Sequence, residues 1–482
     1  MSSTFIFIVL IAYFLVLIGI SFLTSRGANN DTFYLGNKQS PWFLVAFGMI
    51  GASLSGITFI SIPGWVGDAG KQFGYMQMVL GYLAGYFVIS FVLMPLYYKM
   101  NVTSIYTYLQ KRFGTEAHKI GAIYFLVSRI TGASIRLLLV ANVLQAFVFD
   151  EFNIPFEITV FISIALIWVY TFKGGIKTII WTDTLQTLFM LLSLGFTFWF
   201  LATELDLTET GGLIKTVKNS EYSQIFFFED WNGKYHFVKM FFGGMFIAIG
   251  MTGLDQDMMQ KNLSCKNLKS AQTNMVSFSI VLVFINLIFL ILGALLYLYA
   301  GQEGISIPEK TDLLFPQIAL KSNIGIGIGI LFLLGLIAAA YSSADSALTS
   351  LTTSICVDFL DTEKEKTSKK RRQLIHLLMS AVLFVTVVIL NKTLDESAIW
   401  QLIWLAGFTY GPLIGLFFFG ILTRLQLRKN LIVLACLAPP ILTYSIHSEL
   451  SNIGFELGGS LIIVNSFLTF FSLFLISQKK AS

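Results

Sequence analysis

The sequence predicts an all-α polytopic membrane protein with about 13 transmembrane helices. Of its 482 residues, 55% are hydrophobic and only 12% are charged, and the mean hydropathy is +0.75. A soluble domain carries roughly 25% charged residues. Apolar runs of about 20 residues, the length that crosses a bilayer, recur along the whole chain. These observations exclude an ordinary soluble protein, and the net charge of +5 gives no basis for nucleic-acid binding.

Thirteen apolar segments are predicted to form the membrane-spanning helices. They cover residues 5–23, 42–66, 75–98, 120–148, 155–172, 178–203, 236–256, 273–299, 324–356, 374–391, 398–423, 430–446 and 457–477. The first segment is interpreted as a retained span, because no basic region precedes it and no small-residue cleavage site follows it. Basic residues are about threefold more numerous in the loops on one side than on the other. We therefore expect the N-terminus outside and the C-terminus inside the cytoplasmic membrane.

The second segment, 42–66, has a polar and glycine-rich middle between Gly48 and Thr58. Ser53, Ser55 and Thr58 supply three hydroxyls within this stretch. Glycines weaken the helix and permit an unwound stretch whose carbonyls face a cavity. Close helix packing through small residues is the alternative. The hydroxyls exceed what packing needs, so an unwound stretch is favoured.

The fourth segment, 120–148, contains Arg129 and Arg136. A separation of seven residues is almost two helical turns, so both guanidinium groups lie on one face about 10 Å apart. They could bind an anionic substrate, or they could neutralise buried acids such as Asp183 and Asp345. Both interpretations remain open.

The sixth segment, 178–203, carries Asp183 near its predicted inner end. A charge at a helix centre costs ~2.5–3.5 kcal/mol, so an intramembrane acid indicates function. An interfacial carboxylate is the alternative. If Asp183 reaches the hydroxyls of the ninth segment, the two segments form a charged cation site.

The ninth segment, 324–356, places Ser342, Asp345, Ser346 and Thr349 on one helical face, because they are spaced i, i+3, i+4 and i+7. Hydroxyls, freed carbonyls and a carboxylate are hard oxygen donors that suit an alkali or alkaline-earth cation. The hydroxyls alone could bond back to their own helix. Asp345 needs a partner that this alternative does not supply.

With these residues in view, the chain resembles the sodium:solute symporter family, which includes bacterial sodium/sugar and sodium/sialic acid symporters. The resemblance runs from the first span to about residue 423 and is carried by five motifs in the family's order. They are Ser53–Pro63, Thr103–Leu109, Gly174–Asp183, Leu254–Lys261 followed by Lys266 and Asn267, and the Ser342–Ser343 helix.

The resemblance implies a leucine-transporter-like architecture with two inverted five-helix repeats, spans 2–6 and 7–11, in which spans 2 and 7 are broken at the midplane. Gly243, Gly244 and Gly250 fit the second break. The single transmembrane domain, 1–482, then divides into an extra N-terminal span at 5–23, repeats at 42–203 and 236–423, and two C-terminal spans at 430–477.

The resemblance also implies two cation sites. The common sodium site falls on the carbonyls of Gly51, Leu54 and Ala339 and on the hydroxyls of Ser342 and Ser343. The second site, which some members have, falls on Asp183, Ser342, Asp345 and Ser346. The family usually has Ser or Thr where this chain has Asp345, which raises the negative charge of the site. We predict that the second site is either occupied by sodium or protonated, and Asp345→Asn tests this.

For the substrate, the resemblance implies a cavity lined from spans 2, 3, 4, 7 and 11. The residues are Ser53, Ser55, Thr58, Gln77, Gly81, Arg129, Arg136, Gln401 and Trp404. Sialic-acid members hold the carboxylate with a span 4 arginine. This favours sodium-coupled import of an anionic organic solute, such as an acidic sugar or carboxylate, by alternating access. A neutral sugar or polyol is the main alternative.

A passive channel or facilitator is the alternative from another class, but a channel needs a continuous polar pore. An enzyme is not expected, because no nucleophile–base set or metal motif is present. The expected partners are a small organic solute, sodium ions and the lipid bilayer. No nucleic acid is expected, and the protein is expected to be monomeric.

Overall fold

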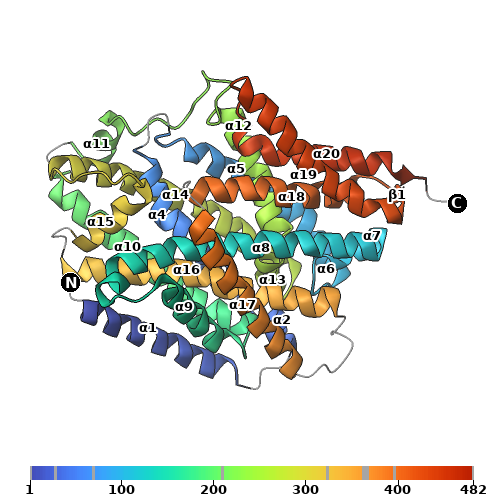
Figure 1. The fold of residues 1–482 in the computed structure, drawn as a ribbon, viewed down its shortest axis with the longest axis horizontal. Helices are drawn as coiled ribbons and strands as arrows, with labels where there is room; N and C mark the ends of the chain where they lie inside the picture. The colour runs from blue at the N-terminus through green and yellow to red at the C-terminus, as the bar shows by residue number, and fades with distance from the viewer. Residues whose placement is uncertain are drawn as a thin grey trace.

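The computed structural model describes residues 3–26, 30–67, 71–207, 211–321, 325–360, 369–393 and 398–479, and they are almost entirely helical (Figure 1). Two short strands, β1 (Gln426–Leu427) and β2 (Ser477–Gln478), pair antiparallel and join the segment after α18 to the end of the chain. The predicted all-α fold class is confirmed.

Ten helical segments of the described chain are long and apolar enough to cross a membrane. In chain order these are α1 (Ser3–Thr24), α5 (Tyr75–Val88) continued by η2 (Ile89–Leu93) and α6 (Met94–Met100), α8 (Thr115–Leu144), α10 (Ile176–Glu204), α14 (Leu268–Gln302), α16 (Ile326–Ser354) continued by η7 (Ile355–Phe359), α17 (Lys369–Thr393), α18 (Ala398–Leu422), α19 (Lys429–Asn452), and η8 (Gly458–Ser460) continued by α20 (Leu461–Leu475).

Two further spans are bent. α3 (Trp42–Ser53) and α4 (Gly56–Trp65) meet at 53°, and α12 (Phe237–Ala248), extended by the π-helical turn η5 (Ile249–Gly253), meets α13 (Gln256–Leu263) at 63°. Counting each bent pair as one span gives up to 12 spans in the described residues. A shorter apolar helix, α9 (Phe156–Thr171), coincides with the remaining predicted segment. The total of 13 spans and the bounds of the two repeats stay predictions.

The remaining helices are short and connect or flank the spans. They are α2 (Asn30–Leu35), η1 (Gly36–Lys38), α7 (Thr107–Phe113), η3 (Gln145–Phe149), η4 (Asp150–Phe152), α11 (Leu213–Asn219), η6 (Thr311–Leu313) and α15 (Leu314–Lys321).

The first bent pair breaks inside the stretch that the sequence singled out. α3 ends at Ser53, and Ser55 has an extended backbone with φ −63° and ψ 175° before α4 starts. The glycines before the break allow close packing on α10. A Cβ atom at Gly48 would lie 3.1 Å from the Asp183 Cβ, and one at Gly51 would lie 2.1 Å from the Thr187 Oγ1. Unwinding and close packing therefore both occur, in adjacent parts of the same span.

The second bent pair breaks at Leu254 and Asp255, which is later than the glycines predicted for it. Asp255 caps α13, because its Oδ1 accepts the backbone N–H groups of Asp257 at 2.9 Å and Met258 at 3.3 Å. Gly243 and Gly244 lie within regular helix, where added Cβ atoms would come within 2.4 Å of backbone oxygens of other segments. Gly250 lies in the π-helical turn.

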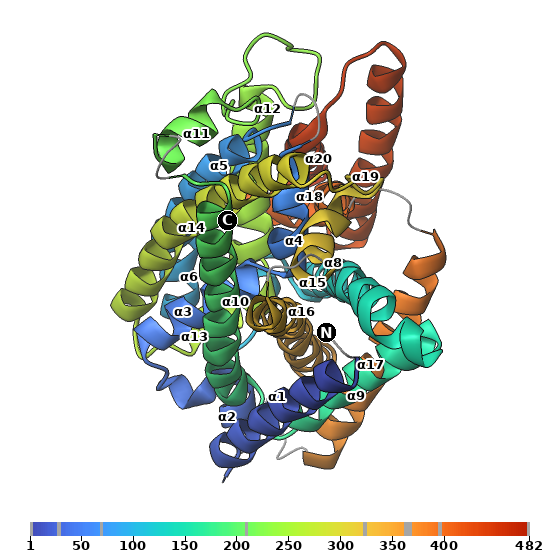
Figure 2. The ribbon, with the colours of Figure 1, turned by 90° about the vertical axis from the view of Figure 1, so that its left-hand side faces the viewer.

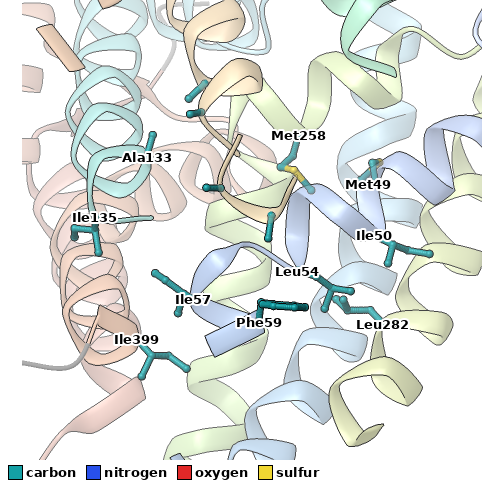
Figure 3. Close-up of a cluster of buried hydrophobic side chains, with 14 of the residues drawn as sticks. Met49, Ile50, Leu54, Ile57, Phe59, Ala133, Ile135, Met258, Leu282 and Ile399 are labelled. Atoms are coloured by element: carbon teal, nitrogen blue, oxygen red, sulfur yellow. The ribbon is translucent and has the colours of Figure 1, made fainter. Parts of the chain in front are cut away.

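The helices around the two breaks form the centre of the molecule. α10 packs along α16 and against α3, while α12 packs along α5. Figure 2 shows α1 at the edge of the bundle, next to α9. Apolar side chains close the space around the first break, among them Leu54 and Ile57 with Met258 of α13 (Figure 3). The polar groups near the breaks are thus enclosed by protein.

Candidate functional site

A cavity of about 110 Å³ lies beside the two breaks. Ser53, Ser55 and Thr58, which were predicted from the sequence, line it, and so do Arg129 and Arg136. The other polar side chains in its wall are Tyr75, Tyr82, Tyr86, Thr252 and Asn286. The cavity therefore combines hydroxyl and amide groups with two guanidinium groups.

The two arginines of α8 differ in their partners. Arg129 is buried and forms an ion pair with Asp257 of α13. Arg136 has 9% of its surface exposed and makes no ion pair with the described residues, and its Nε has no hydrogen-bond partner. The counter-ion interpretation therefore describes Arg129, although its acid is Asp257 rather than Asp183 or Asp345. The Arg136 guanidinium therefore has N–H donors that are available to a ligand.

Two residues predicted for the cavity lie outside its lining. Gln77 is fully buried, and its side chain bonds the backbone of Gly74, Phe227 and Tyr235 at 3.0–3.2 Å. A Cβ atom at Gly81 would lie 2.0 Å from the Phe241 backbone oxygen, so this glycine lets α5 approach α12. Both positions hold helices and loops together and offer no group to a ligand.

Gln401 and Trp404 also lie outside the central cavity. They line a separate hollow of about 790 Å³ between α17, α18 and α19, and 48% of the Trp404 surface is exposed. The resemblance implied these residues from their position along span 11, which gives a distance along α18 but not the direction in which its side chains point. The α18 residues in the cavity wall are instead Ile399, Leu402 and Ile403.

A buried charge cluster links α10, α13 and α16. Asp183 of α10 is fully buried, and its Oδ1 accepts a hydrogen bond from the Ser342 hydroxyl at 2.6 Å. Its Oδ2 pairs with the Lys261 Nζ at 2.8 Å. Asp183 is thus enclosed by protein, and it reaches the hydroxyl face of α16, as the resemblance implied.

Asp345 lies one helical turn from Ser342 on the same helix and is fully buried. Its Oδ2 accepts a hydrogen bond from the Tyr170 hydroxyl of α9 at 2.9 Å. Its Oδ1 has no partner among the described residues, and neither do the hydroxyls of Ser343, Ser346 and Thr349. These unpartnered oxygens are hard donors, so this part of α16 suits a monovalent cation.

The carbonyl donors implied by the resemblance lie on neighbouring segments. Gly51 and Leu54 are at the C-terminal end of α3, and Ala339 is one turn before Ser342 and Ser343 on α16. α3 packs against both α10 and α16. The five groups therefore come from two adjoining elements at the first break.

Sequence reasoning missed four residues that complete the site. Asp257 and Lys261 lie on α13 and form ion pairs. The Tyr170 hydroxyl donates to Asp345, and the Tyr410 hydroxyl donates to Asp255. Asp257 and Lys261 were quoted as part of a motif, but no charge role was assigned to them. The feature of the sequence that could have indicated a charge role is their separation by four residues, which places both side chains on the same face of a helix.

A comparison with sequence models of protein families identifies the family of this chain. The sequence model of the sodium:solute symporter family matches residues 33–425, which is most of the chain. The chain belongs to the sodium:solute symporter family. This symporter is therefore a sodium-coupled transporter of a small solute and not an enzyme or a passive channel, and sodium is its coupling ion.

Several characterised proteins are similar to this symporter. The sodium/sialic acid symporter NanT of Aliivibrio fischeri is 25% identical over 434 residues, with 88% of this chain and 84% of the relative covered. The sodium/sialic acid symporter SiaT of Proteus mirabilis is 25% identical over 427 residues, covering 85% and 82%. The sodium-coupled monocarboxylate transporter 2 of Bos taurus is 25% identical, covering 86% of this chain and 68% of the relative. The symporter is an integral inner-membrane protein.

Solved structures support the fold. An outward-open, substrate-bound sodium-coupled sialic acid symporter superposes with a TM-score of 0.82 at 20% identity, covering 98% of this chain and 99% of the other. The nucleobase-cation-symport-1 transporter Mhp1, in a closed conformation with bromovinylhydantoin bound, gives 0.58 at 15% identity, covering 93% and 95%. The leucine-transporter-like fold predicted from the resemblance is confirmed.

Proposed function

We propose that this symporter imports an anionic organic solute, a carboxylated sugar or a related carboxylate, together with sodium by alternating access. The observation that carries this proposal is Arg136, a guanidinium in the cavity wall with no acidic partner among the described residues. An unpaired charge in the membrane interior is costly. A solute carboxylate supplies the missing counter-charge and matches the planar donor fork of arginine.

The characterised relatives support a carboxylate substrate. NanT and SiaT are sodium/sialic acid symporters, and another relative is a sodium-coupled monocarboxylate transporter. Sialic acids and monocarboxylates differ in size but share one carboxylate group. Arg136 is the group in this cavity that recognises this common feature. The hydroxyls of Ser53, Ser55 and Thr58 then provide donors and acceptors for the rest of the solute.

We place the driving sodium ion at the first break. The proposed ligands are the carbonyls of Gly51, Leu54 and Ala339 and the hydroxyls of Ser342 and Ser343. The Ser343 hydroxyl supports this assignment, because it is buried and has no partner in the described part of the chain, which is unusual for a hydroxyl. Asp345 adds a negative charge one turn along α16.

Competition and uptake measurements test the role of Arg136. In proteoliposomes with an inward sodium gradient, Arg136→Ala should weaken the affinity for a transported carboxylate by at least about tenfold, because removing one partner of a buried charge pair costs ~2–5 kcal/mol. Sialic acid, lactate and neutral sugars are the competitors. Arg129→Ala is the matched variant, and it should lower the amount of folded protein because Asp257 loses its partner. Unchanged carboxylate affinity in Arg136→Ala rejects the proposal.

A neutral sugar or polyol is the second candidate. Tyr75, Tyr82 and Tyr86 line the same cavity with Asn286, and hydroxyl, amide and aromatic groups suit a sugar ring. A thermal-shift screen of the purified protein separates the two classes. Stabilisation by a neutral sugar in sodium but not in potassium, without a comparable effect of carboxylates, favours this candidate.

We also propose that the N-terminus is outside, that the C-terminus is inside and that the symporter is a monomer. The uneven distribution of basic residues supports the orientation. Cys265, Cys356 and Cys436 are buried, so a cysteine added at either end can be labelled selectively in intact cells. Labelling of the C-terminal cysteine by a membrane-impermeant reagent contradicts the orientation.

Light scattering in detergent measures the oligomeric state.

A further inference from the structure

The side chain of Lys261 lies inside the charge cluster. This residue of α13 is 1% exposed, and its Nζ contacts Asp183 Oδ2 at 2.8 Å. The other oxygen of the carboxylate, Oδ1, accepts the Ser342 hydroxyl at 2.6 Å. Both carboxylate oxygens of Asp183 are therefore bonded within the protein. An additional cation at Asp183 would lie beside the ammonium group and be repelled by its charge.

Asp183 is the acid that the family resemblance assigns to a second sodium ion, together with hydroxyls of α16. The residues present do not fit that role, because an ammonium group carries the same charge as sodium and already neutralises this carboxylate. We propose that Lys261 permanently replaces the second sodium ion, so that one sodium ion accompanies each solute. This inference rests on the proposed function, in which the first sodium ion binds at Ser342 and Ser343.

The packing of α13 holds Lys261 in place. One residue before it, the Gln260 Nε2 donates to the Tyr34 backbone oxygen at 2.6 Å and to the Thr353 hydroxyl at 3.1 Å. Four residues before it, Asp257 pairs with Arg129. A buried lysine that left its carboxylate would expose two uncompensated charges to a medium of low dielectric constant. The ammonium group therefore behaves as a fixed part of the site, unlike a transported ion.

The local charges agree with a single sodium ion. The Asp183–Lys261 pair is neutral as a unit. An ionised Asp345 contributes one negative charge beside it; its Oδ2 is bonded to Tyr170 and its Oδ1 has no partner among the described residues. One sodium ion at the neighbouring hydroxyl and carbonyl groups balances this charge. A second sodium ion would leave an excess positive charge in the membrane interior.

Equilibrium binding of radiolabelled sodium to the purified protein, in choline chloride of constant ionic strength, tests the inference without knowledge of the solute. The wild-type protein should bind about one sodium ion per chain at saturation, and Lys261→Met should bind about two, because the freed Asp183 carboxylate becomes available. Lys261→Arg retains the positive charge and should bind one. The double variant Asp183→Asn, Lys261→Met removes the carboxylate as well and should also bind one.

The outcomes separate this inference from the proposed function. Two sodium ions on the wild-type protein, one on Lys261→Met, or two on the double variant each overturn the inference. If Lys261→Met fails to fold, Lys261→Gln retains the length and polarity of the side chain and takes its place, and the wild-type count is decisive by itself. A wild-type protein that binds no sodium instead contradicts the proposed function.

Discussion

Arg129 of α8 and Asp257 of α13 form a buried ion pair at the wall of the central cavity. Four residues along α13, Lys261 pairs with Asp183 of α10. One short helix thus binds an arginine of the cavity wall through one charge and belongs to the cation cluster through another. Since α13 is the second half of a broken span, a movement of this half-helix would alter both sites together. This arrangement gives a physical route for coupling sodium to the solute.

Removing the charge of Asp257 should destabilise the protein. In Asp257→Asn, Arg129 keeps its charge but loses its partner, and breaking a buried pair from one side costs ~3–5 kcal/mol. The apparent melting temperature in detergent should therefore fall. The double variant Arg129→Met, Asp257→Leu removes both charges and should recover most of the loss. If the single variant is as stable as the wild type, the pair contributes nothing to the fold.

The Ser343 hydroxyl should matter for sodium affinity. It is buried on α16 and has no partner among the described residues, and a bond to a charged group contributes ~1.5–3 kcal/mol. Ser343→Ala should raise the half-saturating sodium concentration for uptake by about tenfold or more. Ser350→Ala is the matched control, because the Ser350 hydroxyl is buried on the same helix but bonds its own backbone at 3.0 Å. Equal sodium affinities in the two variants argue against a ligand role for Ser343.

Asp345→Asn should weaken sodium binding while preserving the side-chain volume. The substitution removes the negative charge beside the sodium ligands, so the half-saturating sodium concentration should rise. Tyr170→Phe, which removes the hydrogen-bond donor but leaves the charge, should have a smaller effect. Uptake measured over a range of sodium concentrations and pH values provides the comparison. Unchanged sodium stoichiometry and pH dependence in Asp345→Asn would remove Asp345 from the cation site.

The sequence allowed prediction of features that depend on a single helix. The concentration of glycine and hydroxyl residues located the first break near Ser55, and helical periodicity placed Ser342 and Asp345 on one face of α16. The resemblance also implied that Asp183 lies close to Ser342 on that face, and the two side chains are hydrogen-bonded.

Features that depend on which helices face each other were not predictable in this way. Periodicity gives the face of α8 that carries Arg129 but not the element opposite, so Asp257 was missed as its partner. Gln77 was assigned to the cavity from its position in span 3, whereas its amide bonds the backbone of three other residues. Trp404 was assigned to the cavity from its distance along span 11, which does not fix the rotation of α18, and in this structure it lines a separate hollow.

Gly51 provides a test of the close approach between α3 and α10. A Cβ atom there would lie 2.1 Å from the Thr187 Oγ1 and 3.1 Å from the Thr187 Cβ, so Gly51→Ala should force the helices apart. Because the Gly51 carbonyl is a proposed sodium ligand, the variant should lose sodium affinity as well as stability. Overpacking typically costs ~1–3 kcal/mol.

Two further variants distinguish a steric effect at Gly51 from a general effect of alanine. Gly195→Ala on α10 adds the same atom where no atom of the described residues lies within 4 Å, so its melting temperature and sodium affinity should match the wild type. Adding Thr187→Ala to Gly51→Ala removes the Oγ1 contact and should restore part of both properties. If the double variant is no better than Gly51→Ala, the contact with the Thr187 Oγ1 is not what requires glycine at this position.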